Sequence, residues 1–113
     1  MDEFESINRA AVIISLKKPF IEWIKYVDSE AQYLDEKHDS KAIYLLPEVS
    51  DTGKSERYLK KNFQKIFEHE LGGWYTDPSL WPKDRSWKVF NEWLDYEIHS
   101  MIFDVLDEPI EKE

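Results

Sequence analysis

The sequence predicts a single α+β domain in which two or three helices pack as one layer on a small three-stranded sheet. Two observations support this fold class. Apolar, β-branched runs alternate along the chain with segments whose apolar residues recur every three to four positions, as strands and helices respectively require. The 113 residues, 42% of them hydrophobic, make up one domain and can form a core. The predicted order of elements is β-α-β-α-α-β.

The three predicted strands come from apolar runs. Residues 9–16 are apolar at both alternating sets of positions and β-branched, which predicts a strand that is buried on two sides or covered by a helix. Residues 42–46 form a second such run, which ends at Pro47. Segment 95–106 fits a strand or a continued helix, and we favour the strand because two strands alone are only marginally stable.

Two helices are predicted between the first strands and the Trp-rich part of the chain. Pro19 suits the first turn of a helix, and apolar residues at helical spacing continue that helix to Val27. The polar segment 28–40 is expected to be a loop or a ragged helical turn. A central helix is predicted over 55–71, with Ser55 as its N-cap and Gly72-Gly73 as its end.

Ser86 is the predicted N-cap of a short third helix, which reaches Trp93 and turns Val89, Phe90 and Trp93 inward. We expect the domain to span residues 1–113, with 1–8 and 108–113 frayed at its ends.

Composition narrows the classes of partner. With 15 Lys and Arg against 24 Asp and Glu, the formal charge is −9, which disfavours binding to nucleic acid. The chain has no Cys and therefore no disulfide or thiolate site. The N-terminal segment is acidic where a signal peptide is basic, and no apolar run is long enough to span a bilayer. We expect a cytoplasmic protein with no membrane partner, metal or cofactor.

The tripeptide Gly53-Lys54-Ser55 resembles the end of a phosphate-binding loop, because it lies between a predicted strand and a predicted helix. That loop also needs a glycine five residues before Gly53, and this position holds Glu48. A turn followed by a helix cap explains the tripeptide better.

The titratable residues suggest few catalytic arrangements. His38 lies among acidic residues and is expected in a solvated loop, and Glu68-His69-Glu70 point in different directions on a helix. His99 is flanked by apolar residues and shares its segment with Asp104, which makes this pair the candidate for acid/base chemistry. On one strand these two residues face opposite ways, so a structural His99 is the favoured interpretation. The acidic pairs are expected to be solvated: Asp2/Glu3, Asp35/Glu36 and Asp107/Glu108.

Four of the five Trp residues fall between positions 74 and 93. Trp side chains bury much area and concentrate in cores, interfaces and ligand grooves alike, so closure of the core and a contact surface both remain open. The candidate binding residues are Trp74, Trp81, Arg85, Trp87 and His99. A basic stripe on the central helix, formed by Arg57, Lys61 and Lys65, is expected to be solvated or to pair with the acidic tail 107–113.

Several Trp and Pro motifs occur together in this chain, among them Trp81-Pro82 and Phe90-x-x-Trp93, with Lys18-Pro19-Phe20 near the first helix. Over residues 9–110 this pattern resembles a family of small, uncharacterised bacterial proteins. The resemblance implies a bacterial cytosolic protein with one compact α+β domain. It implies no activity and no functional residues.

The hypothesis that follows is a small, non-catalytic interaction module, which could self-associate through its Trp-rich segment as a homodimer or bind another protein. Two alternatives belong to other classes. One is a small-ligand protein with a pocket beneath residues 74–82, and the other is a small acid/base enzyme that uses His99 or Asp104.

Overall fold

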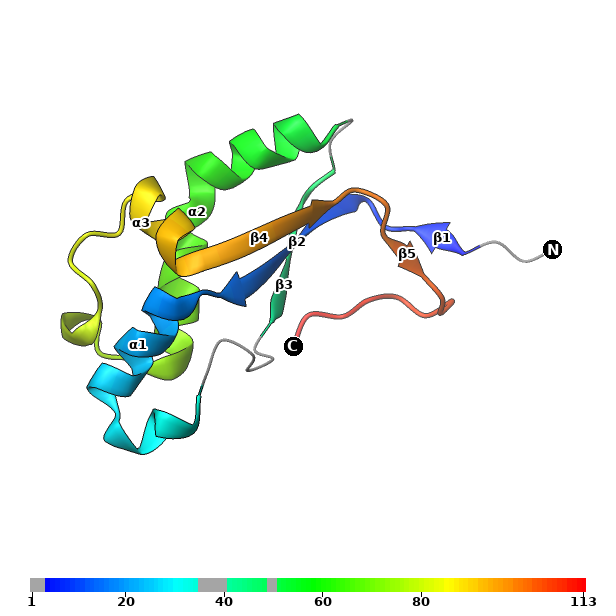
Figure 1. The fold of residues 1–113 in the computed structure, drawn as a ribbon. Coiled ribbons are helices and arrows are strands. Elements are labelled where there is room, and N and C mark those ends of the chain that lie inside the picture. The colour runs from blue at the N-terminus through cyan, green and yellow to red at the C-terminus, as the bar shows by residue number, and fades with distance from the viewer. Residues whose placement is uncertain (1–3, 35–40, 49–50) are drawn as a thin grey trace.

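A computed structural model describes residues 4–34, 41–48 and 51–113. Its main sheet has three antiparallel strands in the order β3-β2-β4: β2 is Arg9–Leu16, β3 is Ala42–Pro47 and β4 is Leu94–His99. Figure 1 shows β2 between the other two. The predicted α+β fold with a three-stranded sheet is confirmed, and the strand interpretation of segment 95–106 holds for its first part.

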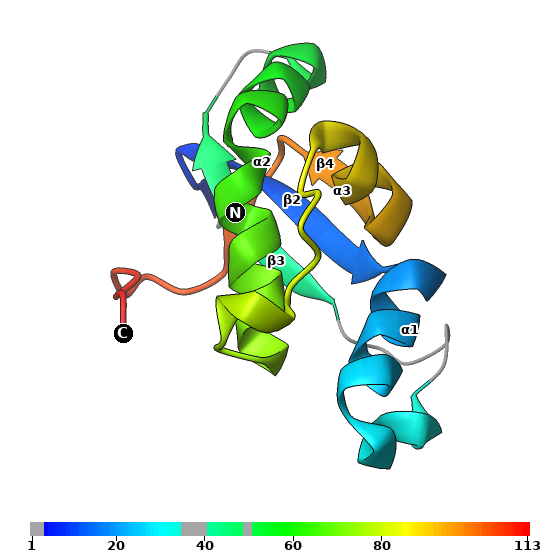
Figure 2. The same cartoon turned by 90° about the vertical axis from the view of Figure 1, so that its left-hand side faces the viewer.

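Three helices accompany the sheet: α1 (Lys18–Val27), α2 (Thr52–Trp74) and α3 (Trp87–Trp93). Figure 2 shows α2 lying across the strands, and this helix contacts both β3 and β4. Two short 3₁₀ helices, η1 (Ser29–Tyr33) and η2 (Pro78–Leu80), lie in the connections. Within the described part of the chain, no helix has the length and apolar character needed to cross a membrane.

The core lies between the helices and one face of the sheet. Even-numbered residues of β2 point into it, and Val12 and Ile14 are fully buried. Large side chains of α2 and α3, including Phe67 and Phe90, meet them from the other side and are also fully buried. The predicted single layer of helices on the sheet is therefore correct for this face.

The ends of α2 differ from the prediction. Its N-cap is Asp51, whose carboxylate accepts a hydrogen bond from the backbone N–H of Lys54 at 2.9 Å. Ser55 is not the cap, because it lies within the first turn and faces the core, where it is fully buried.

Gly72 and Gly73 do not end α2 either. The helix continues to Trp74, and no glycine of the described residues has a positive φ. A Cβ at Gly72 would lie 3.6 Å from the Trp81 ring, an ordinary van der Waals contact.

A feature absent from the prediction is a second, two-stranded sheet made by β1 (Glu5–Ser6) and β5 (Phe103–Asp104). It extends the β2/β4 pair into a ribbon, and Figure 1 shows it at the end of the molecule away from the helices. Between the two sets of pairs, four residues (7–10) face three (100–102). An extra residue of this kind bends and twists a ladder, so segment 95–106 is not one continuous strand.

Candidate interaction surface

The Trp-rich segment packs inward against the core. Trp81 is half-buried, its indole N–H donates to the carbonyl of Tyr75 at 2.8 Å, and its ring lies against Gly72. The guanidinium carbon of Arg85 lies 5.7 Å from the centre of the Trp81 ring, within cation–π range. The same side chain donates to the carbonyl of Pro82 and faces Glu68 at 3.8 Å.

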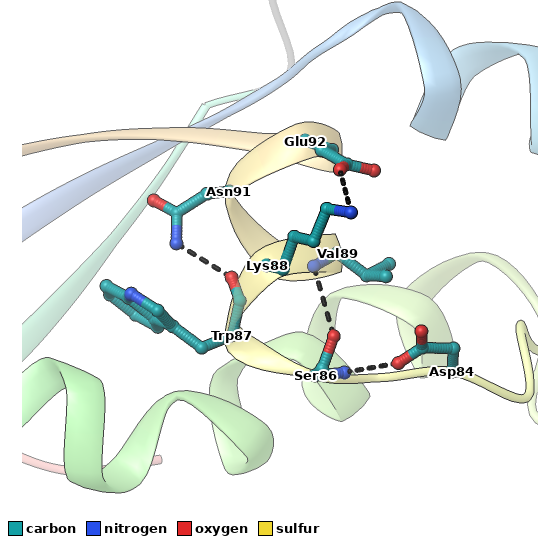
Figure 3. Close-up of polar contacts among 7 residues, drawn as sticks. All are labelled: Asp84, Ser86, Trp87, Lys88, Val89, Asn91 and Glu92. Carbon is teal, nitrogen blue, oxygen red and sulfur yellow. Dashed lines mark hydrogen bonds and ion pairs between the residues drawn. The ribbon is translucent and has the colours of Figure 1, made fainter.

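Trp87 opens α3 and closes the core on that side. Its ring stacks on Phe90 with centroids 5.5 Å apart and meets Phe63 edge-on at 5.4 Å. Figure 3 shows how α3 is started: the Ser86 hydroxyl accepts from the backbone N–H of Val89 at 3.3 Å, as predicted for this cap. The four Trp residues of the segment are partly buried and pack on the core: Trp74, Trp81, Trp87 and Trp93.

Residues 74–82 are fastened to α1 by aromatic side chains. Trp23 donates from its indole N–H to the carbonyl of Leu80 at 2.9 Å, and the Tyr75 hydroxyl donates to the carbonyl of Ile24 at 3.2 Å. The Trp23 and Tyr75 rings meet edge-on with centroids 5.3 Å apart. These rings occupy space beneath the segment where the ligand-pocket hypothesis places its ligand.

The candidate acid/base residues His99 and Asp104 have separate partners. His99 Nε2 lies 3.2 Å from a carboxylate oxygen of Glu97 on the same strand. The Asp104 carboxylate accepts from the backbone N–H of Leu106 at 2.9 Å on the far side of the bend. His38 and the acidic pairs Asp2/Glu3 and Asp35/Glu36 lie outside the described residues.

The sequence did not indicate a cluster of Tyr44, His69 and Glu70, which joins β3 to α2. The Tyr44 hydroxyl donates a hydrogen bond to the Glu70 carboxylate, and His69 Nδ1 lies 2.8 Å from the Tyr44 hydroxyl oxygen. Because the phenol has one hydrogen and gives it to Glu70, His69 Nδ1 is the donor in its own bond. Burial, then the hydrogen bond to Glu70 and its charge, raise the pKa of Tyr44.

A surface hollow of about 290 Å³ lies beside this cluster, between the C-terminal half of α2 and the start of β3. Ligand pockets usually have volumes of about 300–1,000 Å³, so this hollow is at their lower limit. It is lined by Lys41, Ala42, His69, Glu70, Gly73 and Trp74.

The face of the main sheet opposite the core carries exposed apolar side chains on β3. Directly paired residues share a face of a sheet, so the register places Ile13 beside Ile43 and Ala11 beside Leu45 on this side. Ile43 is 66% exposed and Leu45 is 51% exposed. We call these four residues the apolar strip. α2 contacts the sheet from the core side and leaves Ile43 and Leu45 exposed, whereas the small Ala11 between its neighbours is 5% exposed.

A row of polar residues borders the strip on β4. Glu97 pairs with Ile13, and His99 pairs with Ala11. Of the predicted binding residues, His99 therefore lies on the open face. The four others lie at the end of α2, at the start of α3 and in the connection between these helices: Trp74, Trp87, Trp81 and Arg85. Their binding role stays a prediction.

The β1–β5 ribbon is also apolar on one side. Ser6 pairs with Phe103 and Glu5 with Asp104, so alternation places Phe103 on one face and the two acids on the other. Phe4 and Val105 directly flank the two strands. Each of the three apolar side chains is more than half exposed. The exposed apolar residues continue along the C-terminal segment with Leu106 and Ile110.

The basic stripe of α2 does not meet the acidic tail. Arg57, Lys61 and Lys65 are exposed, and the ion pairs found among the described residues do not join them to residues 107–113. The sequence did contain a signal for the apolar strip: β2 and β3 are apolar at both alternating sets of positions, whereas a strand with one wet face alternates apolar with polar residues.

In comparisons with known proteins, no family model, no curated protein and no solved structure matches this chain.

Proposed function

We propose that the chain is a small cytosolic, non-catalytic interaction module whose contact surface is the open face of the main sheet. The observation that carries this proposal is the exposure of Ile43 and Leu45, which are neighbours on one face of β3, beside Ile13 of β2. Scattered surface apolar residues are normal, whereas neighbouring ones on a flat face are typical of a contact surface.

The strands themselves support a covered face. An antiparallel sheet with one wet face has polar residues at alternate positions, but the open-face positions of β3 hold Ile43 and Leu45, and those of β2 include Ala11 and Ile13. A partner that covers the face accounts for this composition. Among the described strands β3 is also an edge strand, and edge strands offer backbone donors and acceptors to a partner.

The Trp-rich segment supports this function less strongly than the sheet. Its rings are partly buried against the core, and the indole N–H of Trp81 already has an acceptor in its own chain. The ligand-pocket and acid/base hypotheses have less support as well, because Trp23 and Tyr75 pack beneath residues 74–82 and because His99 and Asp104 have separate partners.

A photo-crosslinking amino acid tests the proposed surface in cells that naturally make this chain. Placed at Leu45, it should give covalent adducts between this chain and its partner that survive denaturing conditions. Placed at Tyr26, which is 89% exposed on α1, it should give none above background. Equal adduct yields at the two positions, or none at Leu45, would rule out the open face as the contact surface.

A further inference from the structure

We propose that the partner is a second copy of this chain, and that the β1–β5 ribbon of each copy lies over the apolar strip of the other. This inference rests on the proposed function and names its partner.

The two surfaces complement each other within one chain. The ribbon and its flanking residues expose Phe4, Phe103 and Val105, and the strip exposes Ile43 and Leu45. Burial of such side chains is favourable by about 25 cal/mol per Å² of apolar surface. Each surface therefore supplies the cover that the other lacks.

The ribbon extends away from the strip of its own chain. It continues the β2/β4 pair beyond the helices, and a hydrogen bond from Ile7 N–H to the Ile102 carbonyl, at 2.7 Å, secures it at the bend. The radius of gyration is 16.3 Å, whereas a compact chain of this length is expected to have about 13 Å. The longest dimension, 53 Å, is about twice the others, 28 and 25 Å. A protruding apolar ribbon of this kind reaches a neighbour more readily than its own sheet.

Twofold symmetry makes the exchange a closed dimer. Each copy carries one ribbon and one strip, so a twofold axis produces two identical contacts and leaves neither surface over. This closure predicts a dimer as the end point of association.

Charge selects the part of the open face that the ribbon covers. The β4 side of this face carries Asp95 and Glu97, and the outer face of the ribbon carries Glu5 and Asp104. With the ribbon over β2 and β3, both sets of carboxylates stay in water.

Sedimentation velocity across micromolar to millimolar concentrations tests the exchange with three single variants. Phe103→Asp places a charge on the ribbon, Leu45→Asp places one on the strip, and Tyr26→Asp is the matched control on α1. Thermal unfolding confirms that each is folded, and Ile43→Asp replaces Leu45→Asp if that variant is not. The wild type should form a dimer, and the ribbon and strip variants should each raise its dissociation constant at least about tenfold. The control should not change it.

A mixture of the two charged variants provides the sharpest readout. A heterodimer of Phe103→Asp with Leu45→Asp keeps one intact contact, formed by the normal ribbon and the normal strip, whereas neither homodimer keeps any. The mixture should therefore associate more tightly than either variant alone.

Three results would overturn the exchange. A wild type that is monomeric throughout would exclude the second copy, and the crosslinks at Leu45 would then show separately whether another partner uses the open face. A dimer disrupted by Leu45→Asp but not by Phe103→Asp would indicate strip-to-strip packing, which keeps the proposed function but not the exchange. A dimer that neither variant disrupts would place self-association on another surface.

Discussion

Tyr44 on β3 and His69 on α2 are joined by a hydrogen bond of 2.8 Å between the phenolic oxygen and Nδ1 of the imidazole. Together with Glu70, this contact links the edge strand to the helix that covers the core. The link lies on the helix side of β3, and Ile43 and Leu45 of the apolar strip lie on the other face of the same strand. It therefore helps to fix the strand that carries one of the two surfaces of the proposed dimer.

The Tyr44 cluster predicts a loss of stability at high pH. Burial, followed by the hydrogen bond to and the charge of Glu70, raises the pKa of Tyr44 above its ordinary value of 10.0. In the range above about pH 10 the unfolded chain loses this proton and the folded chain retains it, so the free energy of unfolding falls as the pH rises. The stabilisation is complete below pH 10 and is lost above it. Burial raises the pKa of Tyr75 and Tyr96 in the same direction.

The measurement is chemical denaturation of the wild type and Tyr44→Phe at a series of alkaline pH values. The variant should lose about 0.5–1.5 kcal/mol at neutral pH and show a shallower decline above pH 10. The exposed Tyr26→Phe is the control. Parallel pH profiles for wild type and Tyr44→Phe would show that the phenol is not shielded in the folded chain.

The two glycines inside α2 predict a gain in stability. Both adopt helical geometry without a positive φ, and a Cβ at Gly73 would meet no atom within 4 Å. Gly73→Ala should raise the free energy of unfolding by about 0.5–1 kcal/mol, since glycine costs that much in a helix. Gly72→Ala is the comparison, because its Cβ would meet the Trp81 ring at an ordinary 3.6 Å. A destabilised Gly73→Ala would mean that the helix ends before this residue.

These glycines also show where prediction from sequence stopped. The bounds of β2 and the short helix after Ser86 followed from local patterns, because apolar spacing and a cap are short-range properties. Gly72-Gly73 is a common helix end by the same local rules, but the helix continues through both glycines to Trp74. The pairing of Glu5 with Asp104 joins opposite ends of the chain, and no local pattern contains it.

The candidate surface, like the fold, was predictable from the sequence only in part. The apolar character of both faces of residues 9–16 was visible in the sequence and predicted a strand that is buried on two sides or covered by a helix; in the structure the helices cover the face that carries Val12 and Ile14. Which face the helices cover depends on the register of β2 with β3 and β4, which only the fold supplies. The Tyr44 and His69 contact was missed because it spans two elements whose relative position the sequence does not give.

The Trp-rich segment gives a prediction that separates core from contact surface. Trp93 meets Phe20 edge-on at 5.8 Å and Phe67 at 6.1 Å, so Trp93→Ala should cost about 3–5 kcal/mol of unfolding free energy. Trp81→Ala should cost less, because Trp81 packs at the edge of the core beside Gly72 and Arg85. It should also leave the dimer dissociation constant unchanged. Weaker association of Trp81→Ala at unchanged stability would instead assign the contact to the Trp-rich segment.

Salt should strengthen self-association. Each copy has a formal charge of −9, so two copies repel each other at low ionic strength while the proposed contact is largely apolar. Screening shortens the reach of this repulsion to about 10 Å at 0.1 M salt. The dissociation constant, measured by sedimentation, should fall as sodium chloride rises. A constant that rises with salt would indicate that ion pairs, not apolar burial, hold the copies together.

Cross-linking between single cysteines shows whether the ribbon of one copy lies over the strip of another. The chain has no cysteine of its own, so Phe103→Cys and Leu45→Cys each introduce one defined thiol. The two variants, one carrying a tag that gives the mixed dimer a distinct mass, are combined and treated with a bis-maleimide. We expect a mixed cross-linked dimer in high yield, and little of it from Phe103→Cys combined with Tyr26→Cys. Equal yields from the two mixtures, or no mixed dimer with Leu45→Cys, would contradict this arrangement.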